Sequence, residues 1–444
     1  MKRQFFSVLL LLSLALAASA QTAQVAHSDA VQQNLRTNIA YLASDKLEGR
    51  RTGEAGATKT ADYIAKQFAK LKLKPGMHDA NGKATYLQPF PGKAAAPDKP
   101  VTGYNVIGIL DGTDKQLKNE AIVIGAHYDH LGHGGDGSLA PNSTDIHHGA
   151  DDNASGTAAI IELARQFAKE KKNKRTIIFI AFSGEEEGLF GSKYYVNNPV
   201  FPIENTVAMI NLDMVGRLKD DKLTIGGIGT ATEWKALLEQ KNGPPDIIGH
   251  AYNAKNQYVP VSVGKSKAFE LQLNEDGFGP SDHSSFYTKK VPVLFFFTGT
   301  HLDYHKPSDT ADKINYEGEE KVINYVTSIA RSIDQNSLKP TYTVAKSTAT
   351  PGGGRAGISI TLGTIPSYTD STDGMVIDGV RDSSPAARAG LKANDKIVKL
   401  AGKGINNVQD YTRVLGEMKA DIEYEIVIIR GAERMTLKIV PVKR

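Results

Sequence analysis

Three apolar stretches constrain the fold of this chain more than any other feature. They read AIVIGAH at 121–127, RTIIFIAF at 175–182 and TVAMINLD at 206–213. Apolar runs of this length are typical of strands buried on both faces, as in parallel sheets. Helical patterns lie between them, such as SGTAAIIELARQFAKEKK at 155–172. The alternation of strands and helices therefore indicates an α/β protein with a largely parallel central sheet.

The alternating pattern ends near Gln335, where the composition changes. The segment LKPTYTVAKSTATPGGGRAG is rich in Thr, Pro and Gly and has no hydrophobic period, as expected of a linker. Short strand patterns follow it. In this chain of 444 residues we expect a first domain over 21–335, a linker over 336–354 and a small β-rich domain over 355–444.

The N-terminal 20 residues have the three parts of a secretory signal peptide. Lys2 and Arg3 supply positive charge, residues 5–17 are apolar, and Ala18-Ser19-Ala20 is a small-residue cleavage site. We expect cleavage after Ala20 and export to the periplasm or the medium. The apolar stretch is short for a membrane span, so a membrane anchor is the weaker alternative.

Composition limits the partners and the metal chemistry. The formal net charge of +4 is too small to indicate nucleic acid or a membrane surface as a partner. The chain has no cysteine, which excludes disulfides and thiolate-bound zinc. Any metal must therefore be bound by His, Asp and Glu.

Potential metal ligands follow the ends of the predicted strands. They are His127 and Asp129 in GAHYDH, Asp151 and Asp152 in HHGADDNASG, Asp213 in INLDMVG, and His301 and His305 in HLDYHKPSDT. Each could by itself be an ordinary structural residue, such as a loop polar residue, a helix cap or a strand-end carboxylate. Ligands of α/β sheets bind beyond the carboxyl ends of the strands. The set as a whole therefore indicates two divalent cations, with zinc favoured by the imidazoles.

Three consecutive glutamates at 185–187 follow the apolar stretch 175–182. Adjacent carboxylates repel each other, and burying them is costly unless a cation is present. A metal would explain the run, because one glutamate can bind the metal while its neighbour takes a proton from metal-bound water. Chemistry alone does not distinguish the pair 185 and 186 from the pair 186 and 187.

The ordered motifs HYD, GADDNASG, EEEGLFGS, NLDMVGR and YHKPSDT resemble the di-zinc aminopeptidase family of exported metallopeptidases, of the aminopeptidase Y and aminopeptidase S type. They also resemble relatives such as glutamate carboxypeptidases. The similarity covers about residues 28–335. It implies a three-layer α/β/α sandwich with a mixed, largely parallel central sheet.

The resemblance implies a set of metal ligands for two Zn²⁺ ions. His127 and Asp213 would bind one zinc, and Glu186 and His305 would bind the other. Asp152, directly before NASG, would bridge both.

The resemblance also implies catalytic roles. The family pattern Glu-Glu-x-Gly-x-x-Gly-Ser makes Glu185 the general base that activates the water between the zincs. Asp129 would orient His127, and Tyr304 would hydrogen-bond the tetrahedral oxyanion. Glu187 falls at the variable position, so we expect a structural role for it.

Other polar residues near these motifs are not expected to bind zinc. Asp282 and His283 in GPSDHSSF resemble a family segment near the substrate. His147 and His148 are expected to be loop residues.

The C-terminal stretch GMVIDGVRDSSPAARAGLKANDKIVKLAGKGI at 374–405 resembles a PDZ domain. Such a domain adds a peptide to a sheet edge and captures its C-terminal carboxylate. We expect the carboxylate cradle near residues 356–359. A domain that only packs on the first domain is the alternative.

Together these features predict an exported zinc aminopeptidase that acts on peptides with a free N-terminus. The enzyme alternatives are a carboxypeptidase or dipeptidase on the same scaffold and, less favoured, a single-zinc relative that cyclises N-terminal glutamine. A non-catalytic PDZ-type peptide-binding protein is the alternative of a different class. No nucleic acid and no membrane span are expected.

Overall fold

The computed structural model describes residues 28–92, 100–135, 137–140, 143–243, 247–252, 258–264, 267–345, 360–366, 373–380, 384–406 and 408–443. The predicted signal peptide, the cleavage site after Ala20 and the predicted peptide cradle at 356–359 lie outside these residues. Within the described ranges, no helix combines the length and the apolar composition needed to cross a membrane.

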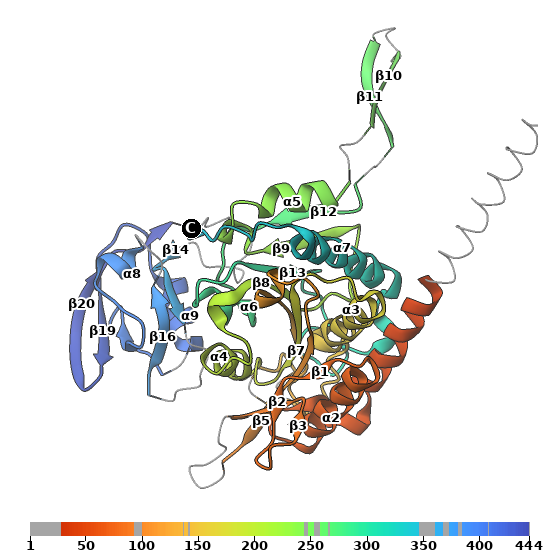
Figure 1. Ribbon diagram of the computed structural model, residues 1–444. Coiled ribbons are helices and arrows are strands. Elements are labelled where there is room, and N and C mark those ends of the chain that lie inside the picture. The colour runs from red at the N-terminus through yellow and green to blue at the C-terminus, as the bar shows by residue number, and fades with distance from the viewer. Residues whose placement is uncertain are drawn as a thin grey trace, which may run out of the picture.

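A mixed sheet forms the centre of the first domain (Figure 1). Its strands are β1 (Lys74–Pro75), β4 (Leu87–Pro91), β5 (Thr102–Leu110), β6 (Ala121–His127), β7 (Thr176–Phe182), β8 (Thr206–Leu212), β9 (Lys222–Gly226), β12 (Glu270–Leu273) and β13 (Val293–Phe297). They follow the order β1-β5-β7-β6-β8-β13-β9-β12, and β4 pairs with β5. The central strands β7, β6, β8 and β13 run parallel, whereas β5 and β9 are antiparallel to their inner neighbours. The three apolar stretches are the centre of this sheet, so the predicted mixed, largely parallel sheet is confirmed.

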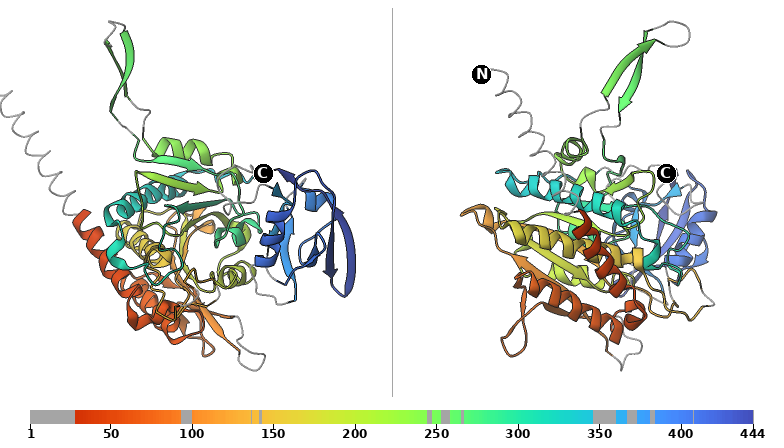
Figure 2. Two further views of the ribbon diagram at one scale, coloured as in Figure 1. Left: turned by 180° about the vertical axis from the view of Figure 1, so that it is seen from behind. Right: turned by 90° about the vertical axis from the view of Figure 1, so that its right-hand side faces the viewer.

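Helices cover both faces of the sheet. The helices are residues 28–42, α2 (Ala55–Lys70), α3 (Gly156–Glu170), α4 (Phe190–Asn197), α5 (Trp234–Lys241), α6 (His283–Tyr287) and α7 (Tyr316–Gln335). On one face, Ile122 and Ile124 of β6 lie in the same core as the buried side chains of α2, α3 and α7. On the other, Val123 shares a core with Tyr195 of α4 and Phe286 of α6. Alternate residues of one strand thus enter two separate cores, which confirms the three-layer α/β/α sandwich (Figures 1 and 2).

Short elements join these layers. They are the turns η1 (Asp45–Arg50), η2 (Leu117–Asn119), η3 (Ala150–Ser155), η4 (Ile203–Asn205), η5 (Ile228–Thr230) and η6 (Ala311–Lys313), and the strands β2 (Met77–His78), β3 (Ala84–Thr85), β10 (Ile247–Tyr252) and β11 (Tyr258–Gly264). The hairpin of β10 and β11 projects away from the sandwich (Figures 1 and 2). The turn η3 directly precedes α3 and carries Asp151 and Asp152.

The C-terminal part of the chain is rich in short strands, as predicted. Its elements are β14 (Ile360–Thr361), β15 (Thr364–Pro366), β16 (Met375–Val380), α8 (Pro385–Arg388), β17 (Lys396–Leu400), β18 (Lys403–Gly404), α9 (Val408–Glu417), β19 (Tyr424–Arg430), β20 (Glu433–Ile439) and β21 (Val442–Lys443). Ile377, Ile397 and Ile426 from three of these strands belong to a core separate from those of the first domain. The short helix α8 begins where the hydroxyl of Ser384 accepts a hydrogen bond from the N–H of Ala387.

Residues that follow α7 contact the first domain. Tyr342 forms a β-bridge with Ala231, and the N–H of Ala345 donates to the hydroxyl of Tyr287. Residues 346–354 of the predicted linker lie outside the described part of the chain. The domain boundaries therefore stay predictions.

Candidate metal centre

The central parallel strands end at one edge of the sheet and deliver polar side chains there. His127 is the last residue of β6, and Asp213 directly follows β8. Glu185 and Glu186 follow the end of β7, and Asp152 lies in η3. Residues far apart in the sequence meet because the carboxyl ends of parallel strands share this edge.

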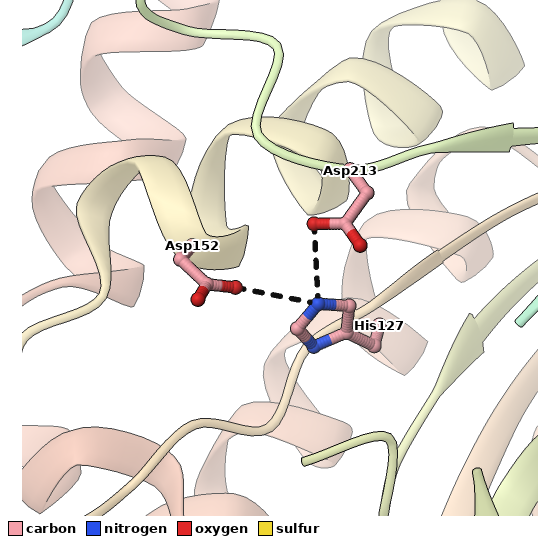
Figure 3. Close-up of side chains that lie close together, drawn as sticks. All are labelled: His127, Asp152 and Asp213. Carbon is pink, nitrogen blue, oxygen red and sulfur yellow. Dashed lines mark ion pairs between the residues drawn. The ribbon is translucent and has the colours of Figure 1, made fainter. Parts of the chain in front are cut away.

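His127 lies between two carboxylates (Figure 3). Its Nε2 is 3.4 Å from Oδ1 of Asp152 and 3.4 Å from Oδ1 of Asp213. All three side chains are buried, and their donor atoms could hold one metal ion. The structure therefore brings together the three residues that were predicted to surround the first metal.

A second group forms around the other oxygen of Asp152. Nε2 of His305 lies 3.2 Å from Oδ2 of Asp152 and 3.1 Å from Oε2 of Glu186. The carbonyl oxygen of Gly137 lies 2.7 Å from Nδ1 of the same imidazole and fixes its ring. Asp152 therefore faces one histidine with each of its two oxygens, which is the arrangement expected of a bridging carboxylate.

His130 also belongs to this second group, although the sequence motifs did not indicate it. Its Nδ1 lies 2.7 Å from Oε1 of Glu186 and 3.9 Å from Oδ2 of Asp152. Together these three residues form a further possible metal group. In an extended strand, residues three apart face opposite sides, so the spacing from His127 does not by itself predict a shared site. The chain leaves β6 at His127, and this turn brings His130 back to the acids. The only sequence signal was a second histidine in GAHYDH.

Asp129 connects His127 to the glutamate run. Its Oδ1 lies 3.7 Å from Nδ1 of His127, although its own main-chain oxygen is closer to that nitrogen, at 3.2 Å. The carboxylate also accepts hydrogen bonds from the N–H of Glu185, at 3.2 Å, and from the hydroxyl of Thr52, at 3.1 Å. Asp129 thus positions both the imidazole and the backbone at the start of the run.

The three glutamates occupy different environments. Oε2 of Glu185 lies 4.0 Å from Nε2 of His127, and Glu186 lies between His130 and His305. Burial raises the pKa of Glu185 well above its usual value, with Glu186 adding to the rise and His127 opposing it. Burial also disfavours charge on Glu186, but His305 and His130 outweigh it and lower its pKa to about 2. Glu187 lies 3.6 Å from Nε of Arg51 and forms an ion pair with it.

Asp309 fixes the backbone that carries the bridging carboxylate. Its Oδ2 accepts hydrogen bonds from the N–H groups of Asp151, at 2.8 Å, and Asp152, at 3.0 Å. Its Oδ1 pairs with Arg217 at 3.3 Å. Asp309 comes from the same motif as His305, so one segment both supplies a donor and positions Asp152.

The remaining predicted residues lie nearby or in supporting loops. The ring of Tyr304 stacks on His305 with 3.8 Å between centroids. Asp282 is buried close enough to His127 for their charges to interact, and burial raises its pKa to about 7. His283 stacks on Phe295 instead.

His147 and His148 stabilise the loop before η3. Nε2 of His147 lies 2.8 Å from the hydroxyl of Ser138, and Nε2 of His148 lies 2.9 Å from Oδ1 of Asp45. Both histidines therefore have partners outside the two donor groups.

Comparison with known proteins gives two family matches. A model of peptidase family M28 matches residues 105–330, just over half of the chain, and a PDZ domain model matches residues 362–440. The first match contains every predicted metal ligand.

Two curated relatives illustrate the similarity. Leupeptin-inactivating enzyme 1 from Streptomyces exfoliatus is 29% identical over 285 residues, which cover 62% of this chain and 50% of that protein. Aminopeptidase YwaD from Bacillus subtilis is 28% identical over 251 residues, which cover 54% of this chain and 46% of YwaD. The chain thus spans about half the length of these relatives.

A solved structure shares the fold. A Zn-dependent exopeptidase from Parabacteroides distasonis matches with a TM-score of 0.51 and 19% identity, covering 67% of this chain and 97% of that one. At this identity the likeness concerns the fold alone. The family match over residues 105–330 shows that the chain belongs to peptidase family M28, and a PDZ domain follows its peptidase domain.

Proposed function

We propose that this chain is a zinc-dependent aminopeptidase, an exopeptidase that removes N-terminal residues from peptides. The observation that carries the proposal is the position of Asp152, whose two oxygens face the histidines of two separate donor groups. A PDZ domain that binds peptide C-termini and an N-terminal signal for export complete the proposal. The name of aminopeptidase YwaD supports this choice within the family.

The donor atoms fit zinc. They are imidazole nitrogens and carboxylate oxygens, which zinc accepts. Bonds of 2.0–2.1 Å in a tetrahedral site place neighbouring donors about 3.3 Å apart. The distances of 3.1–3.4 Å between the histidine nitrogens and the carboxylate oxygens match this spacing. His127 and Asp213 would hold one ion, Glu186 and His305 the other, and Asp152 would bridge them.

When bound, zinc supplies Lewis acidity, which polarises the scissile carbonyl and lowers the pKa of a water ligand. Glu185 takes a proton from the attacking water as its oxygen bonds to the carbonyl carbon. The peptide C–N bond then breaks, and Glu185 returns the proton to the leaving amine. Asp129 keeps Glu185 in place, because its carboxylate accepts a hydrogen bond of 3.2 Å from the N–H of Glu185.

Tyr304 would donate its hydroxyl hydrogen to the developing oxyanion. Burial and the neighbouring acids raise its pKa, so the hydroxyl keeps its proton at neutral pH. Its stacking on His305 places the ring beside the second donor group.

The excess of buried acids favours a substrate amine over a substrate carboxylate. Glu185, Asp213 and Asp282 are close enough for their charges to interact, and a protonated N-terminus would reduce this repulsion. A carboxypeptidase or dipeptidase would instead need a cation that is available to the substrate carboxylate. Arg51 at the glutamate run is already paired with Glu187.

Blocked and unblocked substrates test the aminopeptidase activity. We expect hydrolysis of leucyl-p-nitroanilide, and a loss of about 100-fold or more in kcat/KM when the N-terminus is acetylated, because acetylation removes the charged amine. A chelator should abolish the activity and added zinc should restore it. Equal cleavage of both substrates would contradict an aminopeptidase. Cleavage only of N-acetylated peptides with a free carboxylate would favour the carboxypeptidase.

The glutamate run provides its own matched variants. Glu185→Gln should lower kcat by about 10²- to 10⁴-fold while zinc content stays unchanged, because a general base is lost without loss of a ligand. Glu186→Gln should lower the zinc content. Glu187→Gln is the control and should keep activity within a few fold of the wild type. Wild-type turnover in Glu185→Gln would refute the assignment of the base.

Zinc content distinguishes the two histidines that contact Glu186. We expect His305→Ala to lose one zinc ion per chain. His130→Ala should keep both ions at saturating zinc, with affinity lowered by about 10- to 100-fold, as for a residue that orients a ligand. The reverse result, with the ion lost only in His130→Ala, would make His130 the ligand and His305 its supporting partner.

A further inference from the structure

Arg50 is a buried arginine to which the reaction above gives no role. It is the last residue of η1 and is only 1% exposed. Its guanidinium donates to main-chain carbonyl oxygens of Leu42, Tyr128, His148 and Gly149. Three of these bonds measure 2.7–2.9 Å, within the normal range of hydrogen bonds. A planar guanidinium is suited to this role because it presents five donors in a fixed geometry.

Three of the four carbonyls that Arg50 contacts belong to loops that carry the donor groups, and the fourth, that of Leu42, ends the helix over residues 28–42. Tyr128 lies between His127 and Asp129, and Gly149 begins the approach to Asp152. The main chain around Arg50 adds to these contacts, because the N–H of His130 donates to the carbonyl of Arg50 at 3.3 Å. The side chain of Arg50 therefore connects the loop after β6 to the loop before η3.

Gly49 allows the chain to approach this closely. Its φ of +68° is in the left-handed region that favours glycine. A Cβ atom there would lie 2.5 Å from the carbonyl oxygen of Gly132 and 2.7 Å from that of His147. The turn that carries Arg50 is therefore packed directly against the two loops.

Arg50 is also a buried positive charge among the acids. Its charge interacts with those of Asp152, Asp129, Asp309 and Glu186. Burial lowers its pKa to about 10, with these acids opposing the change, so it stays charged at neutral pH. Because its hydrogen bonds go to carbonyls, the carboxylates keep their oxygens free for other partners.

The buried acids repel one another whenever no metal is bound, because burial weakens the screening of their charges. Zinc would offset this repulsion only once it is bound. We propose that Arg50 is the internal counter-cation of the metal centre: it holds both donor loops and offsets the acidic charge in the metal-free chain, so that zinc enters a preformed site. This inference rests on the proposed function, since it presumes that zinc binds there.

Arg50 contributes to the stability of the chain in two ways. Its hydrogen bonds to carbonyls stabilise the metal-free and zinc-loaded chains alike. Its charge stabilises the metal-free chain more, because zinc supplies positive charge in the loaded chain and is repelled by the guanidinium. Removal of the charge should therefore enlarge the stabilisation that zinc confers.

The experiment measures Tm with saturating zinc and with excess chelator for the wild type, Arg50→Gln and Arg50→Lys. Arg50→Gln should show a zinc-dependent rise in Tm that exceeds the wild-type rise by roughly 2 °C or more, the shift expected for tenfold tighter zinc binding, or about 1.4 kcal/mol. Arg50→Lys keeps the charge and loses the planar set of donors that reaches four separate carbonyls. It should lower both Tm values and leave the rise as in the wild type.

Arg175 provides a matched control. It is also fully buried, and its Nη1 donates to the carbonyls of Ile333, Asp334 and Asn336. Its ion pair is with Glu120, outside the donor groups. Arg175→Gln should lower both Tm values equally.

An unchanged zinc-dependent rise in Arg50→Gln, or an equal enlargement in Arg50→Lys or Arg175→Gln, would overturn the role of the charge. If zinc leaves the wild-type Tm unchanged, the proposed function fails, and this inference fails with it.

Should Arg50→Gln fail to fold, hydrogen exchange of the wild type tests whether the donor loops are already ordered in the metal-free chain. The amides of His130 and Asp151, which are hydrogen-bonded to Arg50 and Asp309, should keep their protection within about tenfold after zinc removal. Loss of this protection would show that the site forms only with zinc and would overturn the proposal.

Discussion

Buried negative charge is the constraint on which this structure depends. The carboxylates of Asp129, Asp152, Glu185, Glu186 and Asp213 gather at one edge of the sheet, and their side chains are largely removed from water. Unscreened carboxylates at such short range repel strongly, so the arrangement requires positive charge nearby. Histidines face the acids directly, and the charge of Arg50 interacts with several of the acids. By our proposal, two zinc ions supply further positive charge. The apolar layers on both faces of the sheet hold these charges together by excluding water.

Much of this arrangement could be predicted from the sequence. The central strands were recognisable because apolar runs without alternation are typical of strands that are covered on both faces. The donor residues could be placed at one edge because parallel strands bring their carboxyl ends together, which is why His127, Asp152 and Asp213 converge as expected. The chemistry of the glutamate run left two pairings open, and the choice of Glu185 as base came from the family pattern. Its catalytic role stays a proposal.

The missed residues act through contacts that local sequence patterns do not reveal. His130 was hidden because strand alternation placed it opposite His127, whereas the chain turns at the end of β6. Asp309 acts through backbone N–H groups of Asp151 and Asp152, which are distant from it in the chain. Arg50 binds carbonyl oxygens, which every residue has, so no motif identifies its partners. Tertiary contacts of this kind become visible only when the loops are placed in space.

The zinc content of the wild-type chain and of Asp152→Asn, measured by elemental analysis after reconstitution, tests whether Asp152 is shared by two zinc sites. We expect two zinc ions per wild-type chain and fewer than one in Asp152→Asn, because both donor groups share this carboxylate. One zinc or none in the wild type, or two in Asp152→Asn, would show that Asp152 does not bridge two zinc sites.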